Sequence, residues 1–344
     1  MKIQLKPLAR QVVVITGATS GVGLVTARKA AQRGARLVLT ARNGAALDQL
    51  QQELSDKGAP VAVLSGDVGE ESDLRKVAAL AIERFGGFDT WVNNAGVAIF
   101  GRLADVPRAD HERLFATNFW GIVHGSLIAL DHLGGKGGAL INLGSEVSDR
   151  AVPLQGMYSA SKHAVKGFTD ALRQEIEAEG LGVSVTLIKP AALDTMFVAH
   201  ARNYMDVEPR LPAPVYAPDL AADAILFAAE HPRRDLFVGG AAKAISSGAH
   251  FAPRLLDKYM ERFMIRQQRT LAPAVRGRDS LYASQFDLRE REGMPLRVRE
   301  TSWYDGAMRH PRATALVATV AGALLAAAVL GGQSRTPMLK SARP

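Results

Sequence analysis

Short apolar runs alternate along the first 240 residues with longer segments in which apolar residues recur every three or four positions. The first run, Val12–Thr16, is rich in β-branched residues, as is typical of a strand buried on both faces. The runs predict strands at residues 12–16, 36–40, 61–65, 88–92, 139–143, 183–188 and 236–238. The periodic segments predict helices at residues 24–33, 45–57, 72–85, 108–132, 155–179 and 218–230. This alternation predicts an α/β fold, a doubly wound parallel sheet of about seven strands with right-handed crossovers and helices on both faces.

Residues 194–217 interrupt the alternation. This segment holds three prolines and a group of large apolar side chains, among them Met196, Phe197 and Tyr204. A loop of this length at the carboxyl edge of a sheet is a candidate lid over a substrate. Its apolar content suggests an apolar substrate, although a lid also needs apolar residues to fold onto whatever it covers.

The pattern changes beyond residue 240, and we expect three parts: a catalytic domain at 1–240, a basic extension at 241–310 and a terminal helix at 311–334. Within the extension, residues 251–269 place apolar residues among Arg254, Lys258 and Arg262, which predicts a basic amphipathic helix that docks on the domain or lies on a membrane. Residues 270–310 are polar and weakly periodic, so we expect a linker or a partly ordered arm.

Ala313–Gly332 contains twenty residues without a charge, which is about the length that spans a bilayer core. Small residues at Ala318, Gly322 and Ala326 lie four apart and could form a helix–helix contact in lipid. The alternative is an alanine-rich helix packed on protein. We expect membrane association through the C-terminus. Because no apolar signal core precedes Val12, we expect the catalytic domain to lie in the cytoplasm.

Composition and charge narrow the function classes. The 344 residues include no cysteine, which excludes disulfides and thiolate metal sites and fits a reducing compartment. The eight histidines show no metal-ligand spacing, so we expect no metal. The net charge of +8 lies in the C-terminal extension, because residues 1–250 hold 26 basic and 26 acidic residues. A nucleic-acid-binding module usually carries its basic patch on the folded domain, so we expect no nucleic-acid partner.

A glycine-rich turn follows the first predicted strand and precedes the first predicted helix. It reads Gly17-Ala-Thr-Ser-Gly-Val-Gly23. Glycines let the backbone approach phosphates, and the helix N-terminus supplies free N–H groups and a positive dipole end. We therefore expect a dinucleotide pyrophosphate to bind at Gly17, Thr19, Ser20, Gly21 and Gly23.

The ends of three later strands carry further nucleotide candidates. Where an NAD-preferring site usually has an acidic residue, this chain has Ala41 followed by Arg42, which can pair with the 2′-phosphate of NADP. We therefore expect NADP(H) in preference to NAD(H), the alternative being a solvated arginine. Asp67 is placed to accept from the adenine amino group or to cap the next helix. The small-residue turn at Asn94, Ala95 and Gly96 is expected to contact the cofactor.

Tyr158 and Lys162 lie four apart on the helix predicted at 155–179, so their side chains share one face. A lysine cation near a phenol favours the phenolate and makes the tyrosine a usable acid or base at neutral pH. Ser145 follows a strand thirteen residues upstream, and Asn118 lies in the middle of a predicted helix. Glu146, directly after the serine, faces either a substrate or solvent.

Over roughly residues 8–240 the chain resembles the short-chain dehydrogenase/reductase family through six motifs in order: Thr16–Gly23, Asn93–Gly96, Asn118, Ser145, Tyr158 and Lys162. The resemblance implies a Rossmann-type domain in which Tyr158 is the catalytic acid/base. It also implies that Lys162 lowers the tyrosine pKa and binds the nicotinamide ribose, that Ser145 binds the substrate oxygen, and that Asn118 holds a water of the proton relay.

The same resemblance implies that Pro190 and Thr195 lie at the nicotinamide, and that the protein is a homo-oligomer. The family usually has Pro-Gly where this chain has Pro190-Ala191. We expect an NADP(H)-dependent oxidoreductase that interconverts a carbonyl and an alcohol on an apolar substrate of sterol, acyl, retinoid or xenobiotic type. The alternative is a non-catalytic NADP-binding sensor or scaffold at a membrane.

Overall fold

The computed structural model describes residues 3–285, 287–293 and 297–309, together with Thr314 and Thr319. The chain divides into two units, Met1–Ser302 and Trp303–Pro344. Helix α11 (Trp303–Arg309) belongs to the second unit. The boundary predicted at residue 240 therefore falls inside the first unit, which also contains residues 241–302.

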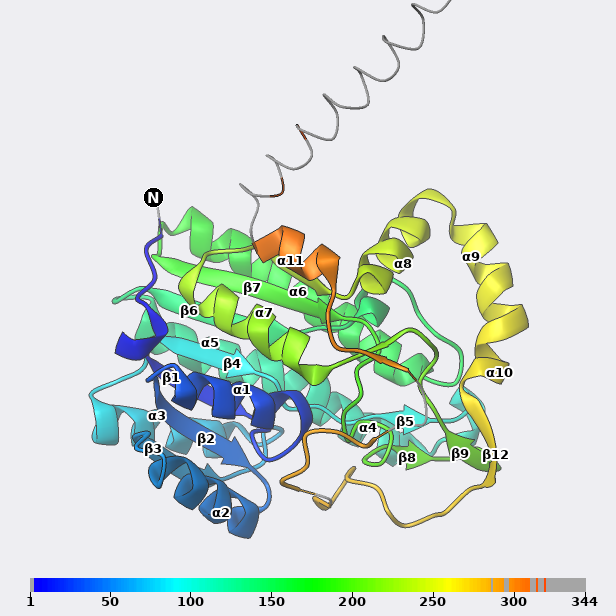
Figure 1. Cartoon of the computed structure of the whole chain (residues 1–344), viewed down its shortest axis with the longest axis horizontal. Helices are drawn as coiled ribbons and strands as arrows, with labels where there is room; N and C mark the ends of the chain where they lie inside the picture. The colour runs from blue at the N-terminus through cyan, green and yellow to red at the C-terminus, as the bar shows by residue number, and fades with distance from the viewer. Residues whose placement is uncertain (1–2, 286, 294–296, 310–313, 315–318, 320–344) are drawn as a thin grey trace, which may run out of the picture. The chain divides into compact units, whose positions relative to one another are not determined.

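A seven-stranded sheet with parallel pairing throughout lies at the centre of the first unit (Figure 1). Its order is β3-β2-β1-β4-β6-β7-β11, so the direction of winding reverses between β1 and β4. The strands are β1 (Val12–Thr16), β2 (Arg36–Ala41), β3 (Val61–Ser65), β4 (Thr90–Asn93), β6 (Gly138–Leu143), β7 (Val183–Pro190) and β11 (Asp235–Val238). The predicted doubly wound parallel sheet is confirmed.

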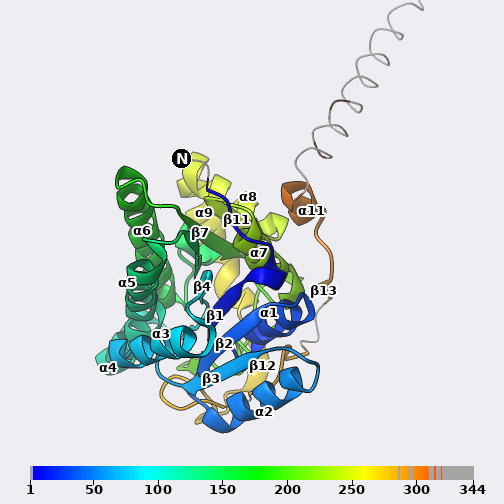
Figure 2. The same ribbon diagram turned by 90° about the vertical axis from the view of Figure 1, so that its left-hand side faces the viewer.

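Helices cover both faces of this sheet, as the side view shows (Figure 2). On one face α1 packs against α7, with α2 beside β2 and β3; on the other face α3 packs against α5, and α4 against α6. Their bounds are α1 (Gly21–Gln32), α2 (Gly44–Ser55), α3 (Glu71–Phe85), α4 (Arg108–Phe115), α5 (Gly121–Leu133), α6 (Gly156–Ala178) and α7 (Pro218–Glu230). All five residues of β1 are buried, as the two-sided burial of a central parallel strand requires.

The helix predicted at 108–132 is interrupted in its middle. Residues Ala116–Trp120 form a π-helical turn between α4 and α5. Such turns occur often at functional sites, because they rotate the side chains that follow by an extra residue. Here the turn contains Asn118, which is fully buried.

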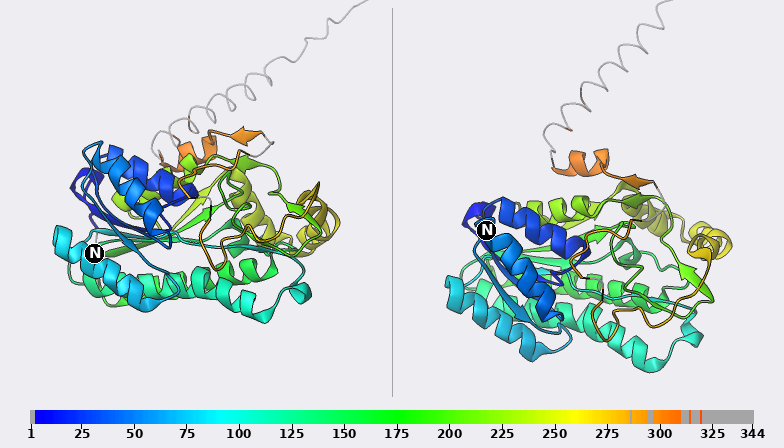
Figure 3. Two further views of the ribbon diagram at one scale, coloured as in Figure 1. Left: turned by 90° about the horizontal axis from the view of Figure 1, so that it is seen from below. Right: turned by 60° about the horizontal axis from the view of Figure 1, so that its bottom comes forward.

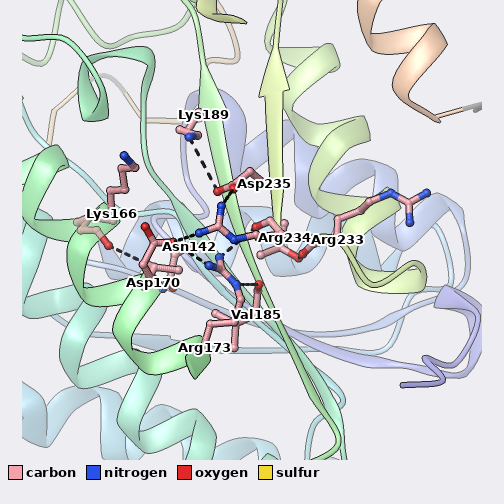
Figure 4. Close-up of polar contacts among 12 residues, drawn as sticks. Asn142, Lys166, Asp170, Arg173, Val185, Lys189, Arg233, Arg234 and Asp235 are labelled. Atoms are coloured by element: carbon pink, nitrogen blue, oxygen red, sulfur yellow. Dashed lines mark hydrogen bonds and ion pairs between the residues drawn. The ribbon is translucent and has the colours of Figure 1, made fainter. Parts of the chain in front are cut away.

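An ion-pair network fastens helix α6 to the edge of the sheet (Figure 4). Asp170 of α6 accepts from Arg173 at 2.8 Å and from Arg234 at 2.9 Å. Arg173 also donates to the carbonyl oxygen of Val185 in β7, at 3.1 Å, and Arg234 pairs with Asp235 of β11 at 2.7 Å. Because Tyr158 and Lys162 lie on the same helix, this network fixes their distance from the strand ends.

The segments outside the central sheet pair with one another in short two-stranded ladders. In the predicted lid, β8 (Arg202–Asn203) pairs with β5 (Ile99–Phe100), and β9 (Val207–Pro209) with β12 (Arg269–Pro273). Likewise β10 (Val215–Tyr216) pairs with β13 (Val298–Arg299). Residues 270–310 were predicted to be a linker or a partly ordered arm; within that range, β12 and β13 pair with strands of the first unit.

The amphipathic helix predicted at 251–269 corresponds to a helical segment from Pro253 to Gln267 that contains a π-helical turn. Helix α8 (Gly240–Phe251) ends at Ala252, whose φ of −140° is not helical, and α9 (Pro253–Tyr259) continues through a π-helical turn at Met260–Met264 into α10 (Ile265–Gln267). Among the residues that the structure describes, no helix is long and apolar enough to cross a membrane. The helix predicted at 311–334 lies almost wholly outside those residues.

Candidate active site

One cavity runs along the carboxyl edge of the sheet, where the strand order reverses. Open α/β sheets bind their ligands at this position. The cavity is lined by most of the predicted site residues: Gly17, Thr19, Ser20, Gly21, Arg42, Asp67, Asn94, Ala95, Gly96, Ser145, Tyr158, Lys162, Pro190 and Thr195. Gly23 and Asn118 are not part of the lining and support it from behind.

The glycine turn between β1 and α1 has room only for hydrogen at two positions. Gly17 has a φ of +64°, and a Cβ there would lie 2.8 Å from the Cα of Ala95. A Cβ on Gly23 would lie 2.1 Å from the carbonyl oxygen of Gly17. The turn therefore lies close against its neighbours and lines the cavity at the start of α1, a cradle that fits a dinucleotide pyrophosphate.

Asn94 holds this turn in place from the end of β4. Its side-chain nitrogen donates to the carbonyl oxygens of Thr16 and Gly17, at 2.9 and 3.1 Å. The Thr16 hydroxyl accepts in return from the backbone N–H groups of Asn94 and Ala95, at 3.0 and 3.1 Å. The predicted Asn94–Gly96 turn thus lines the cavity and also positions the glycine turn.

Arg42 and Asp67 line the part of the cavity on the side of the glycine turn, which we call the nucleotide half. Both side chains have partners within the protein. Arg42 donates to the carbonyl oxygens of Ser280 and Leu281, the latter at 3.1 Å, and burial lowers its pKa. Asp67 accepts from the guanidinium of Arg113 and from the N–H of Gly69, the latter at 2.9 Å. The alternative that Asp67 caps the next helix is wrong, because α3 begins after Glu70 and has no side-chain cap.

Ser145, Tyr158 and Lys162 meet at the opposite end of the cavity. Tyr158 and Ser145 line the cavity side by side, close enough for the Ser145 side chain to lower the Tyr158 pKa. The buried Lys162 ammonium donates to the carbonyl oxygen of Leu143 at 2.7 Å, and lies 5.9 Å from the centre of the Tyr158 ring. The predicted one-face placement of Tyr158 and Lys162 on a helix is confirmed by α6.

The pKa values of this pair differ from the prediction. Burial raises the pKa of Tyr158 above its ordinary value, the nearby Ser145 side chain lowers it, and the carboxylate of Glu146 raises it further. Burial also lowers the pKa of Lys162 to about 8. The predicted lowering of the tyrosine pKa by Lys162 is therefore not seen in this structure, where the ammonium is bonded to a backbone carbonyl and faces the ring.

Asn118 uses its side chain to join three elements behind the catalytic end. Its Oδ1 accepts from the N–H of Val97 at 2.8 Å, and its Nδ2 donates to the carbonyl oxygen of Val97 at 2.9 Å and to Ser161 at 3.3 Å. The side chain thus connects the end of β4 with α6.

Pro190 and Thr195 line the cavity where the resemblance predicted the nicotinamide to bind. Pro190 is the last residue of β7, two residues beyond the predicted strand end. Thr195 packs against Gly21, since a Cβ on that glycine would lie 3.1 Å from the Thr195 Cβ. The Thr195 hydroxyl accepts from the N–H of Phe197 at 3.3 Å. Ala191, which stands where the family has glycine, is buried without disturbing β7.

Several residues of the cavity were missed by sequence reasoning. Four come from the C-terminal extension, namely Ser280, Ser284, Gln285 and Asp287. No motif marks them, and only the position of the chain in space brings them to the glycine turn. Glu146, which the sequence left open between substrate and solvent, lines the cavity, and burial raises its pKa to about 7.

Within the described residues no group of three or more His, Cys, Asp or Glu side chains is arranged to hold a metal ion. The cavity presents two hydroxyl groups, an ammonium group and a glycine-rich cradle. Together these define an oxidoreductase of the α/β class.

The chain belongs to the short-chain dehydrogenase/reductase family, because the family model described as short chain dehydrogenase matches residues 11–206. It is 45% identical over 320 residues to an uncharacterized oxidoreductase, YxnA, of Bacillus subtilis, a match that covers 92% of this chain and 90% of the relative. A match of that length must include residues of the C-terminal extension.

Two solved structures show the same fold. A short-chain dehydrogenase/reductase of Burkholderia phymatum in complex with NAD has a TM-score of 0.64 and 25% identity, over 80% of this chain and all of that one. An alcohol dehydrogenase of Thermococcus sibiricus complexed with 5-hydroxy-NADP has a TM-score of 0.58 and 27% identity, over 66% of this chain and 95% of that one. Together they support a nicotinamide cofactor without deciding which one.

Proposed function

We propose that this protein reduces a carbonyl compound to an alcohol, or catalyses the reverse oxidation, with a nicotinamide dinucleotide as hydride carrier. The observation that carries the proposal is a single cavity lined by Ser145, Tyr158 and Lys162 together with the glycine turn. The glycine turn, Asn94 and Thr195 would hold the dinucleotide. When bound, it supplies the hydride that the carbonyl carbon accepts.

The protein's own groups supply the other half of the reaction. Tyr158 gives the proton of its hydroxyl to the carbonyl oxygen, and Ser145 donates a hydrogen bond to the same oxygen as negative charge develops there. Lys162 keeps a positive charge beside the tyrosine, since with a pKa of about 8 it is mostly protonated at neutral pH. Hydride on carbon and proton on oxygen together convert C=O to CH–OH.

An apolar substrate fits the lining next to this pair. The cavity wall there includes Val147, Val152, Met196, Phe197 and Leu211. From the extension, Met260 and Met264 pack on Val147, Val152 and Tyr158. Apolar walls with a few placed polar groups are usual for sites that bind hydrophobic small molecules. This lining supports a substrate of sterol, acyl, retinoid or xenobiotic type.

The substitution Tyr158→Phe tests the proposal. It removes one hydroxyl from the cavity, and turnover of apolar ketones should fall at least a hundredfold, which is about what a positioned proton donor contributes. Dinucleotide binding, measured by fluorescence titration, should stay within about threefold. The control is Tyr259→Phe, which removes an exposed hydroxyl outside the cavity and should leave both quantities unchanged. Normal turnover in Tyr158→Phe would overturn the proposal.

The competing function is a non-catalytic dinucleotide-binding sensor or scaffold. The described cavity argues against it, because a binding protein has no need of the Ser145–Tyr158 pair or of a buried ammonium beside it. The sensor would be favoured if the protein binds a dinucleotide tightly and yet turns over none of a broad panel of apolar ketones and alcohols.

The choice between NADP(H) and NAD(H) is a separate question, and the sequence predicted NADP(H) from Arg42. Arg42 lines the nucleotide half of the cavity, which supports it. Both terminal nitrogens of Arg42 donate to carbonyl oxygens of the extension, which weighs against it, because pairing with a phosphate would require giving up those bonds. We therefore look to the extension itself for the group that selects between NADP(H) and NAD(H).

We also propose contacts beyond the substrate. Trp120 at the end of the π-helical turn and Leu127 of α5 expose 50% and 47% of their surface. These exposed apolar side chains support a homo-oligomer, which light scattering on the purified protein can test. Membrane association through residues 311–334 is tested by deleting 311–344 and fractionating cells. Recovery of the full-length protein without detergent would exclude a membrane-spanning tail.

A further inference from the structure

A segment of the C-terminal extension lies along the nucleotide half of the cavity. We call its residues 279–285 and 287–291 the strap. In Figures 1 and 3 it is the gold to orange chain that returns from β12 along the carboxyl edge of the sheet toward the start of α1. The family model ends at residue 206, so the strap belongs to none of the motifs on which the family assignment rests.

Backbone hydrogen bonds attach the strap to the glycine turn. The N–H of Leu288 donates to the carbonyl oxygen of Thr19 at 2.6 Å. The N–H of Gly21 donates to the carbonyl oxygen of Arg289 at 3.0 Å. The strap is therefore held in register with the turn that cradles the dinucleotide.

Ion pairs hold both ends of the strap to the catalytic domain. Asp279 pairs with Arg202 at 3.1 Å, Glu290 with Arg28 at 2.7 Å, and Arg291 with Asp219 at 2.9 Å. Between these ends, the carbonyl oxygen of Leu281 accepts from Arg42 and Arg113, both at 3.1 Å. These contacts come from several separate elements, so the strap has a defined position over the cavity edge.

Asp287 is the acidic residue that the strap adds to the cavity lining. One of its carboxylate oxygens accepts from the Thr19 hydroxyl at 2.6 Å, and the other accepts from the Asn43 side chain at 2.8 Å and from Ser284 at 3.0 Å. A carboxylate has about four acceptor positions. Three are used, which leaves one for a further donor in the cavity.

The place of Asp287 identifies that donor. Thr19 belongs to the glycine turn, and Asn43 follows Arg42 at the end of β2, the strand whose end faces the adenosine ribose in dinucleotide-binding sheets. In NAD-binding sheets an acidic residue on that strand accepts from the ribose 2′-hydroxyl. Here β2 ends in Ala41, and the carboxylate near this strand end belongs to Asp287 of the C-terminal extension.

We propose that Asp287 contacts the 2′ position of the adenosine ribose and selects NAD(H) over NADP(H). A free 2′-hydroxyl donates to the remaining acceptor position of the carboxylate. A 2′-phosphate instead brings like charge against it, and Arg42, which could neutralise the phosphate, is bonded to the carbonyl oxygens of Ser280 and Leu281. The inference rests on the proposed dinucleotide function and assigns its cofactor class.

The test is the binding of four probes, NAD⁺, NADP⁺, 5′-AMP and 2′,5′-ADP, to the full-length protein by titration calorimetry. The native protein should bind NAD⁺ more tightly than NADP⁺. Asp287→Asn keeps the shape and an acceptor for Thr19, and should shift the NADP⁺ to NAD⁺ affinity ratio roughly tenfold or more toward NADP⁺. The ratio for 2′,5′-ADP over 5′-AMP should move by the same factor, since the two differ at the 2′-phosphate.

Glu290→Gln is the matched control, because it removes the same charge from the strap at a side chain bonded to Arg28 and outside the lining. Its affinity ratio should stay native. A second variant, Asp287→Ser, guards against a misfolded strap, which would weaken all four probes alike. An unchanged ratio in both Asp287 variants, or an equal shift in Glu290→Gln, would overturn the inference. Failure to bind any probe would instead overturn the proposed function.

Discussion

The catalytic domain and the C-terminal extension are held together by different kinds of contact. In the domain, β1 is buried on both faces, and the main core packs Trp91, Phe88 and Ile176 between helices and sheet. The strap of the extension is held largely by arginine side chains and backbone hydrogen bonds, such as those from Arg42 and Leu288. The catalytic domain is therefore stabilised by buried apolar area. The strap is stabilised by polar contacts with the surface of that domain.

This difference suggests that one kind of contact determines the fold and the other determines ligand specificity. Burial of apolar area is non-directional and tolerant of detail, so it can specify a sheet that many unrelated activities share. Hydrogen bonds and ion pairs are directional, and those of the strap place one carboxylate, Asp287, at the glycine turn. Substitutions that affect the two kinds of contact should therefore differ in size and in what they change.

The largest effect is expected in the glycine turn of the domain. Gly23→Ala places a Cβ 2.1 Å from the Gly17 carbonyl oxygen, so the turn must shift, with about 1–3 kcal/mol of overpacking strain. We expect loss of dinucleotide binding and a lower unfolding midpoint in urea. Gly167→Ala on α6 is the control, because a Cβ there meets nothing within 4 Å, and it should stabilise the helix by about 1 kcal/mol. Equal behaviour of the two variants would show that the turn has room to spare.

A pH-dependent effect is expected at Glu146. Its folded pKa of about 7 lies above the value of 4.5 for the unfolded chain, so its protonated form favours the folded state. This contribution is complete below pH 4.5 and is lost as the pH rises through 7. Relative to Glu146→Gln, the native protein should lose about 1–2 kcal/mol between these limits, discounted because the residue is partly exposed.

Urea unfolding of the native protein and Glu146→Gln at pH 4.5, 6 and 8 measures this difference. The two proteins should be nearly equal at pH 4.5, and the variant should be the more stable at pH 8. Glu112→Gln, at an exposed position on α4, is the control and should show no such trend. A difference that stays constant with pH would show that the Glu146 carboxyl is solvated.

A smaller effect on global stability is expected from Arg42→Met, which removes both hydrogen bonds to the strap. The local cost should be about 1–3 kcal/mol, confined to the strap because the core of the sheet is untouched. Hydrogen exchange of Leu288 should accelerate, while the urea midpoint stays close to native. Arg108→Met, an exposed residue paired only along its own helix, should change neither. Unchanged exchange in Arg42→Met would mean that other contacts suffice to hold the strap.

The smallest effect on stability is expected at the outer face of the extension. Phe251 and Leu255 expose 83% and 72% of their surface beside the exposed Arg254 and Lys258. Replacing the two apolar residues by serine should change the free energy of unfolding by less than about 0.5 kcal/mol. If this face binds a membrane, the double variant should cosediment less with anionic vesicles than the native protein does. Native-like cosedimentation would remove this face as a lipid contact.

The central sheet and the order of the site motifs could be predicted from the sequence because the periodicity of buried residues follows from the geometry of strands and helices. Val12–Thr16 and Pro218–Glu230 have the predicted bounds. The π-helical turn at Asn118 was not predicted, because a shift of one residue in the apolar period is hard to recognise within a single helix. The strap was missed for a different reason. Its polar residues have no period, and their partners, such as Thr19 and Arg42, lie far away in the sequence.

The contact between Thr19 and Asp287 joins residues 268 positions apart. A ribosome that has made the seven strands of the sheet still has the strap to synthesise, and N-terminal parts of a protein generally fold first during synthesis. On the proposed function, the glycine turn could therefore bind a dinucleotide before Asp287, which would contact the adenosine ribose, has been synthesised. Nascent and C-terminally truncated chains would accept either cofactor, and discrimination would be acquired only when synthesis has passed Asp287.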